Sequence, residues 1–253
     1  MQTTIQRSTE NEHYVPQFSL RKFAIPGRKT YDLFVYERNN AIYEKPVKWC
    51  ASQANFYENS NLPPNTVEKF LQKMESKVGG AFKSIESGNP LSPNEKWVLS
   101  QFLSIQLTRV PDFFDLAKRI GRGLMGKEPD SLVTLSFITD ELARIFFKMK
   151  WACYEAPASL AFVTCDNPVS FDRTLGLLHR KTVVGFPVSP KWFLVMSLEL
   201  SLEAYLPGTP ELVERCNRSS IGAAKQFVFA GEHSNVIKAQ VDGWLNFYKL
   251  LAP

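Results

Sequence analysis

The sequence predicts an α+β fold, in which an antiparallel or mixed sheet combines an N-terminal hairpin with C-terminal strands. Strand-like segments occupy both ends of the chain, and the segment between them, residues 65–150, has the periodicity of helices. The regular strand–helix alternation of a doubly wound fold does not occur in the sequence. We therefore expect a single domain over residues 1–253, with the helical segment inserted between the sheet-forming parts and residues 1–10 flexible.

The N-terminal part is expected to form a short helix and then a hairpin. Pro16 suits the first turn of a helix, because it has no N–H to donate there. Residues 31–36 are rich in aromatic and β-branched side chains, and residues 38–40 (Arg-Asn-Asn) supply a turn. Residues 41–49 then form the returning strand.

Four helices are expected in the central segment, covering residues 65–85, 92–108, 112–120 and 129–150. Asn65 is a suitable N-cap for the first helix. The second helix begins with a capping box, in which Ser92 and Glu95 satisfy each other's backbone N–H groups. It ends before Pro111, since the residue preceding a proline disfavours helical geometry.

The C-terminal part changes back to short strand-forming segments separated by Pro, Asp and Asn. The strands are expected at residues 151–154, 160–164, 182–186, 192–197 and 226–230. Two helices are expected here, at residues 209–225 and 236–251.

Composition and charge indicate a cytoplasmic protein without a membrane span. The formal charge of +5 permits an acidic partner such as a nucleic acid or nucleotide, but it does not require one. The four cysteines are scattered and only three histidines occur, so no local spacing supports a zinc site. The first residues lack the apolar region of a signal peptide, and no apolar stretch is long enough to cross a bilayer.

Two polar residues interrupt the apolar face of the helix expected at residues 92–108. Gln106 and Arg109 continue stripes that are otherwise made of Leu, Val, Phe and Ile. A buried amide or guanidinium must find partners, and Glu75 on the preceding helix is placed to pair with Arg109. Two interpretations remain open: an internal ion pair that joins two helices, or a polar pocket whose guanidinium binds phosphate or carboxylate.

Other polar residues stand at positions where chemistry can occur. His13 lies among apolar neighbours, which suits either a hydrogen-bonded core histidine or a general base. Gln17 follows four residues later and would face the same site if the chain is helical there. Asp166 and Asn167 follow an apolar segment and precede a proline, so they suit either a catalytic position or an Asx turn.

Several motifs together resemble a bacterial family of proteins with a domain of unknown function, number 4238. They occur in order along the chain as HYVPQF at 13–18, NFY at 55–57, Gln106 with Arg109 and Pro111, TCDNP at 164–168 and FPVSP at 186–190. The resemblance implies no reaction, but it groups His13, Gln17, Gln106, Arg109, Asp166 and Asn167 as one candidate cluster. Families of this type include phage-defence and toxin proteins, which suggests an antiviral role.

Two functional hypotheses follow. If the protein is an enzyme, these polar residues suit a nuclease or phosphodiesterase, with a divalent metal as an optional cofactor. The catalytic candidates are His13, Gln17, Arg109 and Asp166. Gln106, Asn167 and Glu75 would then contact the substrate. As a binding module, the same residues would recognise a nucleotide or nucleic acid without turnover, or would form an internal network in a protein that contacts a protein partner.

Overall fold

In the computed structural model, the strands form two main sheets and one two-stranded ribbon. The structure describes residues 11–38, 41–54, 56, 66–111, 113, 131–201 and 203–251. The four-stranded sheet, in the order β3-β2-β11-β6, contains β2 (Asp32–Glu37), β3 (Ile42–Pro46), β6 (Thr164–Cys165) and β11 (Phe227–Ala230). The five-stranded sheet, in the order β10-β5-β9-β8-β7, contains β5 (Lys150–Glu155), β7 (Ser170–Phe171), β8 (Val184–Pro187), β9 (Trp192–Ser197) and β10 (Ala204–Pro207). The ribbon pairs β1 (Glu12–His13) with β4 (Ser52–Gln53).

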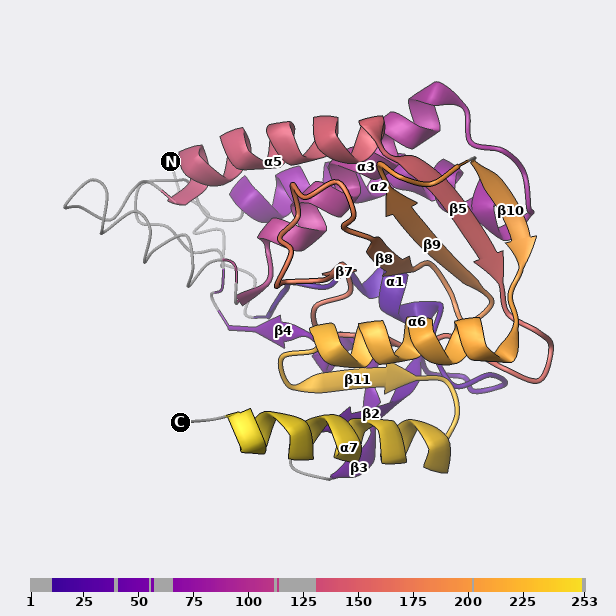
Figure 1. Ribbon diagram of the computed structural model, residues 1–253. Coiled ribbons are helices and arrows are strands. Elements are labelled where there is room, and N and C mark those ends of the chain that lie inside the picture. The colour runs from indigo at the N-terminus through magenta and orange to yellow at the C-terminus, as the bar shows by residue number, and fades with distance from the viewer. Residues whose placement is uncertain are drawn as a thin grey trace, which may run out of the picture.

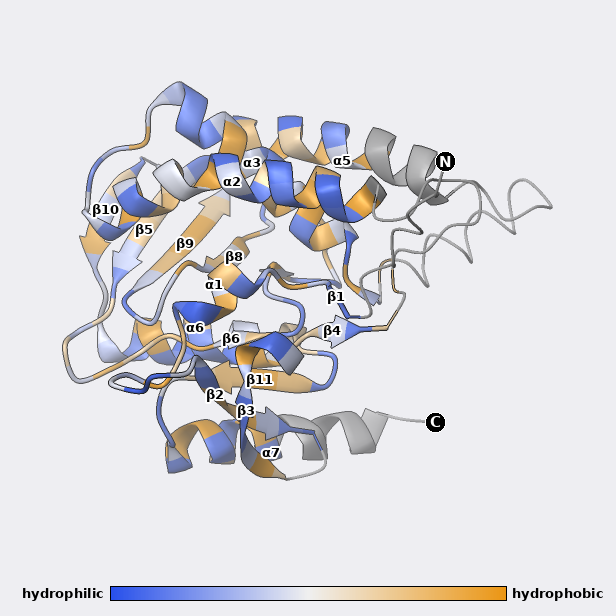
Figure 2. Cartoon of the chain, turned by 180° about the vertical axis from the view of Figure 1, so that it is seen from behind, coloured by the Kyte–Doolittle hydropathy of each residue, from blue (hydrophilic) through white to orange (hydrophobic). Residues whose placement is uncertain are grey.

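The helices separate and cover these sheets (Figure 1). They are α1 (Gln17–Arg21), α2 (Thr66–Glu86), α3 (Pro93–Thr108), α5 (Ser131–Lys148), α6 (Pro210–Ala223) and α7 (Asn235–Leu251), with a short 3-10 helix η1 (Val47–Trp49). One face of the five-stranded sheet packs against α2, α3 and α5, and α6 lies between the two sheets. In Figure 2, β9 and β11 are mainly hydrophobic, whereas the surrounding helices carry hydrophobic and hydrophilic residues side by side.

The hairpin and the second central helix form as the sequence predicts. β2 and β3 pair antiparallel, with Val35 opposite Tyr43, and β11 joins the other edge of β2. At the start of α3, the Ser92 Oγ accepts from the Glu95 N–H (3.2 Å) and the Glu95 Oε2 accepts from the Ser92 N–H (2.9 Å). This confirms the capping box and fixes where α3 begins.

The α+β class and the inserted helical segment are confirmed, but the C-terminal strands divide between two sheets. Among the described C-terminal strands, only β6 and β11 join the hairpin. The strands β5, β7, β8, β9 and β10 form the separate five-stranded sheet. That sheet is mixed, because β10 runs parallel to β5 while the other pairs are antiparallel.

Several expected boundaries are wrong, each for a local reason. The strand expected at residues 160–164 is reduced to β6, because the side chain of Asn217 holds this segment in place of a neighbouring strand. The returning hairpin strand stops at Pro46, after which η1 begins. Pro16 is the N-cap of α1 and has an extended backbone (ψ 137°), so it precedes the helix.

Some expectations fall outside the described residues. The helix expected at residues 112–120 lies almost entirely outside the described residues, and so do Asn65 and residues 1–10. The short strands β1, β4, β7 and β10 were not expected, since two to four residues carry too little periodicity to be recognised.

Candidate functional site

His13 lies on β1, where its backbone is firmly held. It is opposite Ser52 in the antiparallel ribbon, and the next residue, Tyr14, donates its N–H to the Ala51 carbonyl (3.0 Å). Ala51 has a φ of 47°, in the left-handed region that non-glycine residues rarely adopt. Such a conformation persists only where the surrounding structure imposes it. The chain is therefore held in one conformation beside His13.

A buried amide connects this strand to the helices. Gln106 of α3 is fully buried, and its Nε2 donates to the Tyr14 carbonyl (2.9 Å). Its Oε1 accepts from both the Nε (2.9 Å) and the Nη2 (2.6 Å) of Arg109. Gln106 thus has partners for both ends of its amide, as a buried polar group requires. It links the backbone next to His13 directly to the Arg109 guanidinium.

The guanidinium of Arg109 completes the link to α2. Arg109 caps the end of α3, is only 4% exposed, and donates from Nη1 to the Glu75 Oε1 (3.0 Å). The Glu75–Arg109 ion pair that the sequence predicts is therefore confirmed. The Glu75 side chain keeps 24% of its surface exposed, so the pair reaches from the interior to the solvent.

The environment of His13 favours its neutral form. Burial of the imidazole lowers the pKa of His13 below its ordinary value of 6.5, and the positive charge of Arg109 acts in the same direction. Hydrogen bonds to the backbone of Lys48 and Val47, and the negative charge of Glu68, oppose this decrease. With the lowered pKa, the imidazole is uncharged at neutral pH and able to accept a proton.

Glu68 is the residue that sequence reasoning missed. It lies on α2, and its Oε2 is buried without a hydrogen-bond partner among the described residues. Glu68 precedes Glu75 by seven residues, which places both carboxylates on the same side of α2, two turns apart. That spacing was a usable signal in the sequence. We refer to His13, Glu68, Glu75, Gln106 and Arg109 together as the His13 cluster.

The Gln17 side chain is directed to a different partner. Its Oε1 accepts from the Arg21 Nη2 (3.0 Å), one turn further along α1. The prediction that Gln17 and His13 face one site is not decided by this hydrogen bond. Gln17 and Arg21 instead interact on the exposed side of α1.

Asp166 anchors the turn between α6 and β11. Its carboxylate accepts from three consecutive backbone N–H groups, those of Lys225 (2.8 Å), Gln226 (2.8 Å) and Phe227 (3.1 Å). Burial raises the pKa of Asp166 to about 6, while these N–H donors oppose the increase. The contacts of Asp166 thus join β6 to the turn between α6 and β11, and among described residues they do not include the His13 cluster.

Asn167 is buried beside Asp166 and keeps one free acceptor. The residue is 4% exposed, and its Oδ1 has no hydrogen-bond partner among the described residues. An unsatisfied buried acceptor costs free energy, so a donor from a water molecule or a ligand would be favourable there. Asn167 therefore remains a candidate for binding.

The described residues show neither a metal site nor a membrane span. No three His, Cys, Asp or Glu side chains among residues with described positions gather closely enough to hold a metal ion. In the same part of the chain, no helix combines the length and apolar character needed to cross a bilayer.

Comparison with known proteins identifies the family but no reaction. The family model described as "Protein of unknown function (DUF4238)" matches residues 11–234. The chain belongs to the DUF4238 family. The match confirms the resemblance inferred from the motifs, and it includes every residue of the His13 cluster. No curated protein and no solved structure matches this DUF4238 protein.

Proposed function

We propose that this DUF4238 protein hydrolyses phosphodiester bonds in nucleic acids or nucleotides, with His13 as the general base. The observation that carries the proposal is the lowered pKa of His13 within a cluster that also holds a guanidinium. A neutral imidazole can take a proton from an attacking water molecule near physiological pH. The proposal places the protein in the cytoplasm, where nucleic acid is available as substrate.

The remaining members of the His13 cluster would prepare this chemistry. Arg109 adds positive charge near the reacting phosphate, where an anionic transition state develops. Gln106 positions both Arg109 and the backbone next to His13 through its two-sided hydrogen bonding. Asp166 has no chemical step in this proposal, because its carboxylate already accepts from three N–H groups. The Gln17 side chain accepts from Arg21, so Gln17 has no step in this proposal either. The Asn167 Oδ1 is proposed to accept a hydrogen bond from a bound ligand.

A second candidate function has its own support. Arg109 is 4% exposed and uses Nε, Nη1 and Nη2 in internal hydrogen bonds, which suits a structural network. In that case the protein would bind a nucleotide, a nucleic acid or a protein partner without turnover. A role in phage defence is compatible with either candidate and stays a prediction.

The first test is a His13→Ala substitution, assayed on plasmid DNA, RNA and dinucleotides with and without a chelator. We expect the wild type to cleave at least one substrate and His13→Ala to lose activity by about 10²- to 10⁴-fold, the usual contribution of a general base. Wild-type activity should also fall as the pH drops below about 6.5, because the lowered pKa of His13 places its protonation there.

His179→Ala is the matched control, since His179 is exposed and lies in a turn outside the His13 cluster. It should retain full activity. A folded His13→Ala protein that cleaves as fast as the wild type would overturn the proposal. If the wild type binds a nucleic acid but cleaves none of the substrates, the non-catalytic alternative is favoured.

A further inference from the structure

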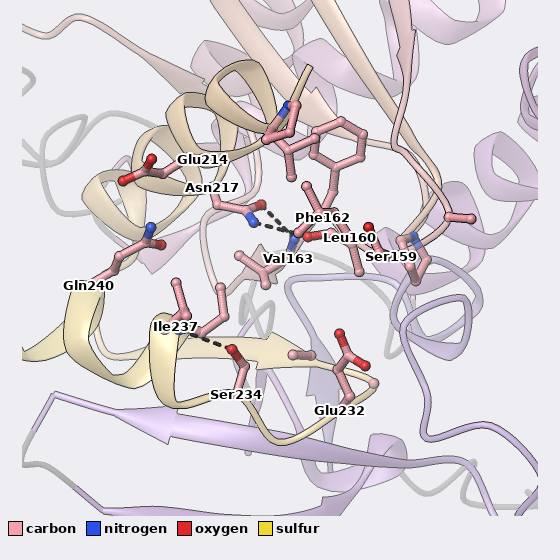
Figure 3. A pocket seen from close by; sticks show the side chains of 18 of the residues that line it. Ser159, Leu160, Phe162, Val163, Glu214, Asn217, Glu232, Ser234, Ile237 and Gln240 are labelled. Carbon is pink, nitrogen blue, oxygen red and sulfur yellow. Dashed lines mark hydrogen bonds between the residues drawn. The ribbon is translucent and has the colours of Figure 1, made fainter. Parts of the chain in front are cut away.

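A cavity of about 770 Å³ lies away from the His13 cluster (Figure 3). Its walls come from the segment after α1, from residues 158–163, from α6, from the turn after β11 and from the first part of α7. It shares no residue with the His13 cluster. Its volume is within the range of pockets that hold small organic molecules.

The walls of this cavity are mainly apolar. Phe162, Val163, Val213 and Ile237 are buried side chains that contribute to the lining, and Leu160 is exposed at 38%. These residues come from three separate segments, so the apolar surface belongs to the folded protein and not to one helix. An apolar body of a ligand would be removed from water here, which is favourable in proportion to its area.

Two of the polar groups in the cavity are already satisfied by the fold. Asn217 accepts from the Val163 N–H (2.9 Å) and donates to the Ala161 carbonyl (3.0 Å). Ser234 caps α7, where its Oγ accepts from the Ile237 N–H (3.3 Å). Neither side chain needs a ligand, and both hold the cavity wall in place.

The charges around the cavity leave one carboxylate unmatched. Lys22 pairs with Glu86 (2.7 Å), and Glu214 pairs with Arg218 (2.5 Å). Glu232 forms no ion pair with any residue that the structure describes.

A second acceptor lies on α7. The Oε1 of Gln240 is buried and has no hydrogen-bond partner within the described residues. Glu232 and Gln240 lie on opposite sides of the cavity in Figure 3, with Val163 and Ile237 between them. Both groups accept hydrogen bonds and favour a donor, and the carboxylate favours a positive charge.

We propose that this cavity binds a small amphipathic organic cation, with an apolar body and an ammonium or similar donor-bearing end. The apolar body lies on the walls from residues 158–163 and α6, and the cationic end lies near Glu232. Because part of one wall is α7, which follows the last residue of the family match, the cavity depends on a helix outside the matched region. This binding site is independent of the proposed hydrolase function.

The test compares two probes that share an alkyl chain and differ in the sign of their charge, octylammonium and octanoate. Binding to the full-length protein is measured by calorimetry below the concentrations at which the probes form micelles. We expect octylammonium to bind at least tenfold more tightly than octanoate. The formal charge of +5 would favour octanoate by non-specific attraction, so this order reports the cavity itself.

Two variants locate the binding. Glu232→Gln should lower the preference for octylammonium over octanoate by about two- to fivefold, as expected for an exposed charge pair, while the buried Gln240 acceptor keeps the rest of the preference. Ala158→Trp places a large ring from an exposed lining position into the cavity and should weaken both probes strongly. Glu199→Gln, at an exposed position outside the cavity, is the control and should bind as the wild type does.

Three results would overturn the proposal. They are no binding of octylammonium to the wild type, equal affinity for the two probes, and unchanged binding by Ala158→Trp. Melting temperatures of all variants are recorded, and Ser159→Trp replaces Ala158→Trp if the latter fails to fold. Ser159 is also exposed and lines the same cavity.

Discussion

Two buried charges, Arg109 and Asp166, are stabilised in different ways. Arg109 is held by side chains from two helices, the amide of Gln106 and the carboxylate of Glu75. Asp166 is held by three backbone N–H groups of one turn. Side-chain partners can be exchanged or can respond to a ligand, whereas backbone partners are fixed by the fold. The comparison suggests that Asp166 is a structural anchor and that a reaction is better sought near Arg109 and His13.

The largest effect is expected from Asp166→Ala. The substitution removes a charged acceptor that takes three hydrogen bonds at once, from the N–H groups of residues 225–227. We expect the free energy of unfolding to decrease by about 4 kcal/mol, because each hydrogen bond to a charged acceptor contributes about 1.5–3 kcal/mol and water partly replaces the acceptor at the exposed residues 225 and 226. Urea unfolding followed by circular dichroism measures this.

Asp172→Ala is the matched control for the anchor. Asp172 is exposed and accepts from the Thr174 N–H (2.8 Å) within its own turn. Its removal should change stability far less than Asp166→Ala does. Equal effects of the two substitutions would show that Asp166 is not an anchor.

Arg109→Met should have the next largest effect. It leaves Glu75 and the Oε1 of Gln106 without their partner, and we expect a loss of about 3 kcal/mol, typical of breaking a buried ion pair. The double variant Arg109→Met/Glu75→Leu should recover at least 1 kcal/mol of this, because the unpaired carboxylate is also removed. A double-mutant cycle with no coupling energy would contradict the ion pair.

The two regions should also respond to pH in opposite directions. The pKa of Asp166 is raised from 3.8 to about 6 in the folded protein, so the folded protein takes up this proton at a higher pH than the unfolded chain does. The contribution of Asp166 to stability therefore increases as the pH falls from about 6 to 3.8. The pKa of His13 is lowered from 6.5 in the folded protein, so the unfolded chain takes up this proton at a higher pH than the folded protein does. Stability is therefore lost as the pH falls below 6.5.

Differences between the wild type and single variants isolate these contributions. Between pH 6 and pH 4, the wild type should gain stability relative to Asp166→Asn. Below pH 6.5, it should lose stability relative to His13→Ala. Urea unfolding over this pH range measures both differences. The assignment of the two roles is contradicted if both differences have the same sign.

The smallest effect is expected from Ser92→Ala at the start of α3. It removes the side-chain acceptor of the capping box and should cost about 1 kcal/mol. Ser92 and Arg109 lie at opposite ends of α3, so the pKa of His13, measured by NMR, should not change. A shift of that pKa would mean that the two ends of α3 are coupled. The effects of Arg109 variants would then include changes along the whole helix.

Short-range patterns in the sequence determined several parts of this protein. The hairpin, the capping box of α3 and the ion pair of Glu75 with Arg109 follow from spacing within a strand, within a helix turn or between two consecutive helices. The family assignment also followed from motifs in the chain. These features depend on residues that are near each other in the sequence or on one regular surface.

Only the tertiary structure decided which distant groups meet. Asp166 accepts from the backbone N–H groups of residues 225–227, about sixty positions away, and its carboxylate thereby anchors β6 to the turn before β11. The charge of Glu68 acts on His13, and the cavity beside α6 and α7 forms, because separate segments pack together. Local periodicity specifies which face of an element is buried, but it does not specify what that face packs against, since contacts between distant segments depend on the whole chain.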